Sequence, residues 1–298
     1  MRKILYPAVL GFLMLCSCED VVNVDLPNEE PRLIVDGLLR VDKSQEYVNV
    51  EITMKETSNF FEENQPTQVE SAVIAYGMPD EFGELTSLAF SSLAEREPGS
   101  GVYIPDPNFS SDQRIRTAAA EPGVVFILQI THKGRDYFAR TEYAPTVPMD
   151  DLAQGDNTLF DEDETEMIVT FTDTPDQNDY YVFDFGFGEF LALDDQFFQG
   201  QQFQFSYFYQ KKLQPGDEVT VSILGATQDF HNYVDLLVEQ TQNNGGVFET
   251  PISTARGNVF DVTDLDNIDV FDNVEQPELF ALGYFAVVQE FERTLTIQ

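Results

Sequence analysis

The stretch FQFSYFY, residues 203–209, carries an aromatic ring at every odd-numbered position. Successive side chains of a β-strand point to opposite faces, so a strand here would collect four rings on one side: Phe203, Phe205, Tyr207 and Tyr209. Alternation of aromatic residues favours a strand over a helix. We expect this row to be core that packs against a helix later in the chain; a solvent-exposed row would instead suit a sugar or a peptide.

Other short runs predict further strands, and together they favour an all-β chain. The runs are residues 33–39, 47–53, 69–76, 124–130, 135–142, 166–172, 180–187, 218–224, 282–288 and 293–298. Two of them flank the Lys133–Gly134 turn and predict a hairpin. In one run Phe183, Phe185 and Phe187 share the face that we expect to be core. Residues 78–121, rich in Pro, Gly and Ser, are expected to carry long loops around short strands.

One helix is expected near residues 229–244. Asp229 can cap its first turn, and Gly245 and Gly246 follow its end. Apolar residues recur at helical spacing between these signals: Phe230, Tyr233, Val234 and Leu237. The helix should therefore pack one apolar face on a sheet.

Two prolines, Pro145 and Pro148, suggest a domain boundary in the middle of the chain. Short strands separated by turn signals are typical of β-sandwiches. We therefore expect an immunoglobulin-like β-sandwich over residues 32–148, followed by a second β-rich domain over residues 149–298 that contains the helix.

The composition is strongly acidic. The 298 residues include 53 Asp and Glu against 16 Lys and Arg, which gives a formal net charge of −37. Such a charge disfavours nucleic acid and anionic lipid surfaces as partners. Solubility and counterion binding explain it most simply; a basic protein partner and a calcium requirement are the alternatives.

The amino terminus has the pattern of an export signal. Arg2 and Lys3 precede an apolar run over residues 4–15. The run has the length of a signal-peptide core and is too short to span a bilayer. We therefore expect residues 1–17 to be a signal peptide that is removed.

The signal ends in the sequence LCSC, residues 15–18, which looks like the lipobox of bacterial lipoproteins. This pattern predicts a lipid on Cys18 that anchors the mature protein, with residues 18–31 as a tether. A plain secretory signal and modification of Cys16 are the alternatives. The pair Glu19-Asp20 resembles the surface-export signal of Bacteroidota lipoproteins, so we expect the outer membrane and the cell surface. Both cysteines lie in this segment, so the mature chain cannot form an internal disulfide.

The sequence offers few residues for catalysis. Its only histidines are His132 and His231, expected on a hairpin turn and in the first turn of the helix, and neither neighbours a nucleophile motif. Phosphate-binding, dinucleotide-binding and zinc-protease motifs do not occur in the sequence. We therefore expect no enzymatic activity, and calcium as the one cofactor to consider.

Acidic clusters are the residues that calcium would use, because this ion prefers oxygen ligands. Three clusters occur: residues 161–164, residues 173–179, and the set Asp261, Asp264, Asp266 and Asp269. None has the spacing of an EF-hand loop. The last set is the best calcium candidate, and solvated acidic loops are the alternative for all three.

Several segments carry a family resemblance that covers nearly the whole chain. They are residues 25–27, 32–37, 127–130, 137–139 and 147–148, the helix with Tyr233, residues 246–248, Pro251, residues 257–259, and the run PELFALGYF at 277–285. Through these segments the chain resembles a family of Bacteroidota lipoproteins known as domain of unknown function 4249. The closing run is the most specific of them.

The resemblance implies a non-catalytic role. Members of the family tend to be encoded beside TonB-dependent outer-membrane transporters, and the family has no assigned catalytic residues. We therefore expect an accessory or scaffold protein of such a transporter or of a related outer-membrane complex. A module that captures peptide or glycan for the transporter, and a surface hydrolase, are the alternatives.

Overall fold

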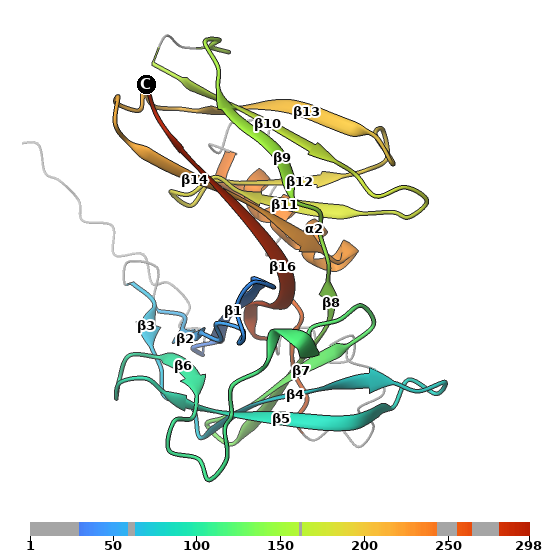
Figure 1. Ribbon diagram of the computed structural model, residues 1–298. Coiled ribbons are helices and arrows are strands. Elements are labelled where there is room, and N and C mark those ends of the chain that lie inside the picture. The colour runs from blue at the N-terminus through green and yellow to red at the C-terminus, as the bar shows by residue number, and fades with distance from the viewer. Residues whose placement is uncertain (1–29, 59–62, 161–162, 243–254, 264–279) are drawn as a thin grey trace, which may run out of the picture. The chain divides into compact units, whose positions relative to one another are not determined.

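The computed structural model describes residues 30–58, 63–160, 163–242, 255–263 and 280–298 (Figure 1). Residues Pro31–Gln298 form one compact unit. Most of this unit is β-strand, with a single α-helix among the described residues, so the prediction of an all-β chain with a helix is confirmed. The immunoglobulin-like topology stays a prediction.

The larger sheet contains thirteen strands, in the order β12-β11-β14-β16-β1-β2-β6-β5-β4-β7-β8-β15, with β3 paired to β2. Their bounds are β1 Leu33–Val41, β2 Ile52–Glu56, β3 Gln65–Pro66, β4 Ser71–Pro79, β5 Leu85–Glu95, β6 Val102–Pro105, β7 Val125–His132, β8 Arg135–Ala144, β11 Tyr180–Asp184, β12 Phe190–Asp194, β14 Glu218–Ala226, β15 Val259–Asp261 and β16 Leu282–Thr296. A short 3-10 helix, η2, spans Thr117–Ala119. The predicted hairpin around Lys133–Gly134 is the pair β7 and β8.

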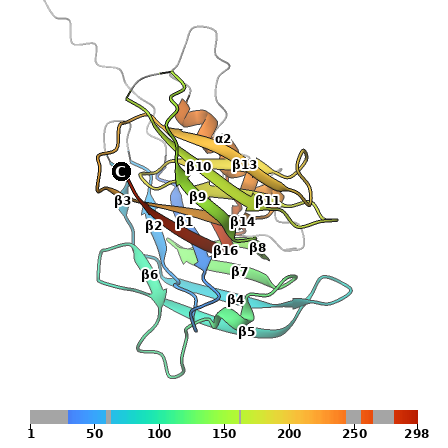
Figure 2. The same ribbon diagram turned by 45° about the horizontal axis from the view of Figure 1, so that its top comes forward.

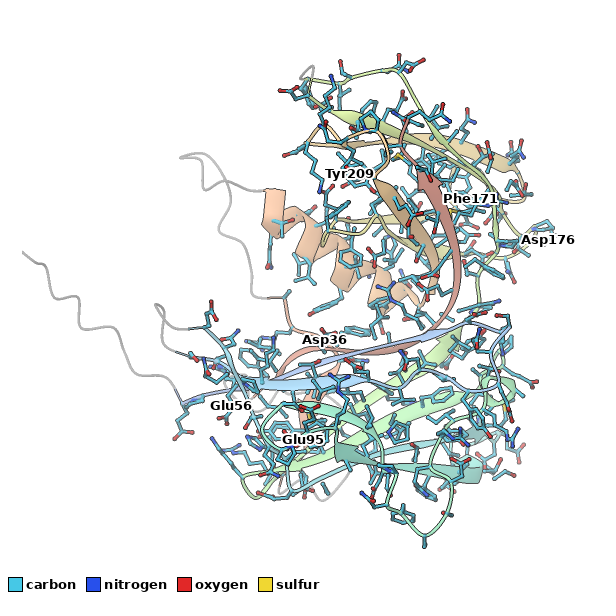
Figure 3. The ribbon with its side chains drawn as sticks, turned by 60° about the vertical axis from the view of Figure 1, so that its left-hand side comes forward. Asp36, Glu56, Glu95, Phe171, Asp176 and Tyr209 are labelled. Atoms are coloured by element: carbon cyan, nitrogen blue, oxygen red, sulfur yellow. The ribbon has the colours of Figure 1, made fainter. Side chains whose placement is uncertain are left out.

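A second sheet has three strands in the order β13-β10-β9. They are β9 Met149–Gln154, β10 Thr165–Thr172 and β13 Gln202–Tyr209. This sheet packs face to face on β11 and β14, and the core between them contains Phe171 and Tyr209, which Figure 3 labels. The stretch of alternating aromatic residues at 203–209 is therefore a strand, as predicted.

Strand β16 joins the two halves of the chain. It pairs antiparallel with β14 and parallel with both β1 and β8. Figures 1 and 2 both draw it in dark red between β14 and β1. Two separate strands were predicted here, at 282–288 and 293–298, and that prediction is wrong because the ladder continues through the polar residues Glu290 and Glu292. The predicted domain boundary at 148 lies between β8 and β9, and β16 contributes to the strands on both sides of it.

The buried apolar side chains form three clusters. A first cluster is built by β1 to β8 and also takes Val259, Phe285 and Val287 from the end of the chain. A second lies between β9, β10 and β13 on one side and β11 and β14 on the other. A third, smaller cluster lies under helix α2, Gln228–Gln242. The C-terminal strand thus supplies buried side chains to all three.

Helix α2 confirms the predicted helix but not its cap. The N–H of Phe230 donates to the Oγ1 atom of Thr227 at 3.2 Å, so Thr227 caps the first turn and Asp229 lies inside it. Phe230 and Val234 pack into the third cluster together with Tyr233 and Val238, whereas Leu237 is exposed. Three of the four predicted face residues therefore pack as expected, and Val238 takes the place of Leu237.

Two strand predictions need correction. Residues 47–53 are not a strand: Tyr47 forms an isolated bridge with Arg116, and β2 begins only at Ile52. Residues 78–121 contain the eleven-residue strand β5, where long loops around short strands were predicted. In β5 five Ser, Thr and Ala residues lie between the apolar ones, so the sequence lacks the alternation that marks a strand.

Phe187 was predicted to share the buried face of Phe183 and Phe185, and this is wrong. The chain turns after β11, where Gly186 has φ +72° and Phe187 has φ +57°. The Phe187 ring leaves the core and is 63% exposed, with the Nζ atom of Lys211 at 3.2 Å from the ring centroid.

Candidate functional site

The predicted lipid site and most of the predicted calcium set lie outside the described residues. These are Cys18, Asp264, Asp266 and Asp269, and the signal peptide 1–17 lies outside them as well. The fourth acid, Asp261, ends β15, where its Oδ2 atom is 2.7 Å from the Nη1 atom of Arg135 and its Oδ1 atom accepts the N–H of Thr263 at 3.0 Å. Within the part of the chain that the structure describes, no group of three or more His, Cys, Asp or Glu side chains is placed to hold a metal ion.

The acidic cluster at residues 173–179 is anchored at its two ends, while residues 175–178 between them are exposed. Buried Asp173 accepts hydrogen bonds from the Tyr181 hydroxyl and, at 2.6 Å, from the N–H of Gly200. The carboxylate of buried Asp195 accepts the N–H of Asp179 at 3.0 Å. Together these bonds tie the β10–β11 loop to the turn that follows β12.

This arrangement raises the pKa of Asp179 above its usual value. Burial is the main cause, and the negative charges of Asp173 and Asp195 add to it, while a hydrogen bond from Gln177 opposes the shift. Sequence reasoning missed Asp195, because it joins the cluster from a turn 16 residues further along the chain. The cluster organises two loops, and the carboxylates of Asp173, Asp179 and Asp195 accept hydrogen bonds from within the protein.

The two histidines lie apart and have different surroundings. His132 ends β7 and is buried, and its Nε2 atom lies 2.9 Å from the Oε1 atom of Glu56 on β2. The same oxygen accepts a hydrogen bond from the Nζ atom of Lys133 at 2.5 Å. His231 lies in the first turn of α2, with its ring 5.3 Å from that of Tyr180. The partners of His132 are those of a buried structural ion pair.

The aromatic row of β13 packs into the second core, but not against the helix as predicted. Its rings face β11: Tyr207 stacks on Phe185 with centroids 3.7 Å apart, and Phe205 meets Phe183 edge to face at 5.1 Å. The Tyr207 hydroxyl donates to Glu189 at 2.6 Å. Helix α2 lies on the other face of the larger sheet, against the third cluster. The inner rings of β13 are therefore engaged with other rings.

A different set of apolar side chains is exposed, on the hairpin formed by β4 and β5. We call this set the hairpin patch; the exposed fractions of its residues are 49% for Met78, 82% for Phe82, 47% for Leu88 and 56% for Phe90. Leu88 and Phe90 lie on the face of β5 opposite to the buried residues Ser91 and Leu93. The patch was missed because residues 78–121 were expected to be loops.

The tip of this hairpin is held in a defined conformation. The Oδ1 atom of Asp80 accepts the N–H groups of Phe82 at 2.8 Å and Glu84 at 3.0 Å. The Thr86 hydroxyl donates to the carbonyl of Met78 at 3.0 Å. Gly83 has φ +81°, which a glycine adopts without strain. The apolar side chains are thus presented by an ordered turn.

No helix among the described residues is both long enough and apolar enough to cross a bilayer.

The fold and these surfaces define a β-rich protein with one α-helix in the part of the chain that the structure describes, hydrogen-bonded carboxylates and an exposed apolar hairpin. Residues 19–294 match the family described as "Domain of unknown function (DUF4249)". The chain belongs to this family, as the sequence resemblance implied.

Other comparisons add little to the family assignment. No curated protein matches the chain. Among solved structures, the crystal structure of red sea bream transglutaminase is similar to 67% of this chain, with 8% sequence identity and a TM-score of 0.22. The chain spans 29% of the transglutaminase.

Proposed function

We propose that this chain is a Bacteroidota lipoprotein, anchored in the outer membrane through Cys18 and facing the cell surface. In this proposal it works as a non-catalytic accessory of a TonB-dependent transporter or a related outer-membrane complex. Family membership and the lipobox support the class of protein. The proposed mode of action is binding to another protein, and the observation that supports it is the exposed hairpin patch.

The hairpin patch gathers four exposed large apolar side chains on one hairpin, whereas Phe187 and Phe197 are exposed singly on separate turns. Monomeric proteins bury most of their large apolar side chains, and contiguous exposed ones mark contact sites. Aromatic residues such as Phe82 and Phe90 are also enriched among residues that dominate binding energy in interfaces. The hairpin patch therefore fits an apolar hollow on a partner.

The charges around the patch define the partner further. Asp80, Glu81 and Glu84 lie in the turn between β4 and β5. These acids would be repelled by anionic lipid headgroups and attracted by lysine or arginine at the rim of a protein hollow. We therefore assign the patch to a protein partner with a basic rim.

Capture of glycan or peptide has less support. The aromatic row that could have formed a platform for such a ligand is packed against Phe183 and Phe185. We therefore do not propose a ligand-capturing role.

Co-purification tests the proposal. The full chain, tagged at its C-terminus and extracted from its own membrane in mild detergent, should bring a barrel protein with it. The double variant Phe82→Ser and Phe90→Ser should reduce recovery of that barrel by at least about tenfold, which corresponds to a loss of ~1.4 kcal/mol in binding. Phe197→Ser is the matched control, because Phe197 is 86% exposed on a different turn.

Two results would refute the proposal. One is a parent chain that is recovered without any barrel protein. The other is a hairpin variant that retains the barrel as well as Phe197→Ser does.

A further inference from the structure

Strand β13, Gln202–Tyr209, is an open edge of the three-stranded sheet. It pairs with β10 on one side, and among the described residues no strand pairs with its other side. Figure 1 shows it in gold as the outer strand of that sheet. Its eight residues carry no charge, in a chain with 53 acidic and 16 basic side chains.

The outward-facing backbone groups can be assigned from the hydrogen bonds that flank the strand. The N–H of Asp173 donates to the carbonyl of Gln201 at 3.0 Å, so the odd-numbered residues of β13 bond to β10. On the other side of β10, the N–H of Gly155 donates to the carbonyl of Glu166, which fits the same alternation. The residues whose N–H and C=O groups point away from the sheet are therefore the even-numbered ones: Gln202, Gln204, Ser206 and Phe208.

Strand β13 lacks the features that keep other edge strands from pairing with a second chain. Natural edge strands are blunted by charge, proline, bulges or short length. The opposite edge of the same sheet, β9, contains Asp150 and Asp151 and a register shift in its pairing with β10. Strand β12, the edge of the larger sheet, is only five residues long and ends in Asp194. Strand β13 is longer, has an unshifted register and has none of these features.

Core side chains are also left partly uncovered along this side of the molecule. Phe203, Phe205 and Tyr207 of β13 are only half-buried, and so are Leu191 and Leu193 of the neighbouring edge strand β12. A further strand beside β13 would extend the sheet over these rings. Such a strand would bury apolar surface in addition to pairing backbone groups.

We propose that the occupant is a second copy of this chain, with the two β13 strands paired antiparallel about a twofold axis at Phe205. This register places Gln204 opposite Ser206 and Phe203 opposite Tyr207 of the second copy. The Gln204 amide then faces the Ser206 hydroxyl on the outer face, and the Phe203 ring faces the Tyr207 ring on the inner face. The same surface serves both copies, as a twofold interface requires.

The absence of charge on β13 permits this pairing, and the net charge of the whole chain sets its salt dependence. No carboxylate of one β13 lies opposite a carboxylate of the other, because the strand has none. Two acids of the same sheet are hydrogen-bonded to β13 itself: the Gln202 side chain donates to Asp150 at 3.0 Å and the Ser206 hydroxyl donates to Glu166 at 2.6 Å. Repulsion between two chains of charge −37 remains, so the dimer should strengthen as salt shortens the Debye length from ~10 Å at 0.1 M to ~3 Å at 1 M.

Sedimentation of the full chain in nonionic detergent tests the pairing with two substitutions at one position. Gln204→Pro removes one outward N–H, whereas Gln204→Val keeps it and removes only the side-chain amide. The parent and Gln204→Val should sediment as dimers, and Gln204→Pro should weaken the dimer by at least about tenfold. A parent that stays monomeric at high salt, or a dimer that Gln204→Pro leaves intact, would overturn the proposal.

Cross-linking gives a second readout that does not depend on a proline variant folding. The double variant Gln204→Cys and Ser206→Cys should form disulfide-linked dimers on mild oxidation, because each introduced thiol faces the other in the second copy. Each single substitution should give far less product. Equal product from the single and double variants would contradict the twofold axis at Phe205.

The dimer does not rest on the proposed function. The hairpin variants Phe82→Ser and Phe90→Ser should sediment like the parent, so failure of the barrel interaction and failure of the dimer are separate results.

Discussion

The Glu56 carboxylate shows how a single residue links distant strands. Burial opposes its ionisation, but hydrogen bonds from Lys133 and His132 outweigh burial and lower its pKa. Lys133 and His132 follow Glu56 in the sequence by more than 70 residues. Figure 3 labels Glu56 at the edge of the first half of the chain. No local pattern in the sequence identifies this pairing.

Replacing this carboxylate should destabilise the protein in a pH-dependent way. A folded-state pKa below the unfolded value means that Glu56 contributes stability above the unfolded pKa, and that this contribution is lost as pH falls through the folded pKa. Glu56→Gln should therefore lower the free energy of unfolding by about 1–2 kcal/mol near neutral pH. In acid the difference from the parent should disappear.

The measurement is urea unfolding of the parent and of Glu56→Gln, at neutral pH and at a pH below the folded pKa of Glu56. Glu51→Gln is the matched control, because Glu51 forms an exposed pair with Arg96 and its loss should change stability by at most about 0.5 kcal/mol. An effect of Glu56→Gln that is equal at both pH values would contradict the assignment.

Asp179 should show the opposite dependence on pH. Its raised pKa means that the folded protein binds a proton more tightly than the unfolded chain does, so ionised Asp179 reduces stability at neutral pH. Asp179→Asn should increase the free energy of unfolding near neutral pH by up to about 1 kcal/mol. The gain should shrink as pH falls through the folded pKa and vanish below the unfolded pKa, where Asp179 is neutral in both states. Thermal unfolding across this range checks it, and a destabilised Asp179→Asn variant at neutral pH would refute it.

The N-terminal cap of helix α2 differs between the sequence prediction, which gave Asp229, and the structure, which has Thr227. Thr227 accepts the N–H of Phe230, whereas Asp229 lies in the first turn and acts only through the helix dipole. Thr227→Ala should cost about 1 kcal/mol of stability. Asp229→Ala should cost only about 0.3 kcal/mol. Chemical denaturation of the two variants measures both effects, and the reverse order would support the cap predicted from the sequence.

The sequence predicts those elements whose pattern is local. Residues 33–39 are an apolar run interrupted only by Asp36 and Gly37, residues 203–209 carry rings at every second position, and both are strands. Strand β5 was missed because small polar residues interrupt its pattern, and the three-residue β15 exists only through its pairing with β8. The continuity of β16 depends on its pairing with β1, about 250 residues away in the sequence. Long-range pairing of this kind leaves no local trace.

The same limit applied to the candidate surfaces. The hairpin patch needs the turn at Asp80 to bring β4 and β5 together, and the open edge of β13 needs the order of strands in its sheet. Neither follows from composition or spacing. The acidic cluster around Asp173 could be located in the sequence, but its partner Asp195 could not.

At the scale of the whole molecule, β16 makes the first half of the chain dependent on the last. Phe285 and Val287 are fully buried in the first core, and β16 pairs with β1 over eight residues. A fragment limited to residues 32–148 would leave the β1 edge and this core open to water. Such a fragment should lack a cooperative unfolding transition when expressed alone.

Circular dichroism and thermal scans of the 32–148 fragment provide the test. The full chain under the same conditions is the control. A fragment that unfolds cooperatively would show that β16 is dispensable for the first core, and would favour two independent domains.

A photoreactive amino acid placed at position 82 in the intact membrane measures whether the hairpin patch contacts another protein. If the patch contacts a partner, irradiation should give one dominant adduct with an outer-membrane barrel protein from position 82, and far less from position 197. No adduct from position 82, or equal adducts from both positions, would contradict the assignment of this hairpin as the binding surface.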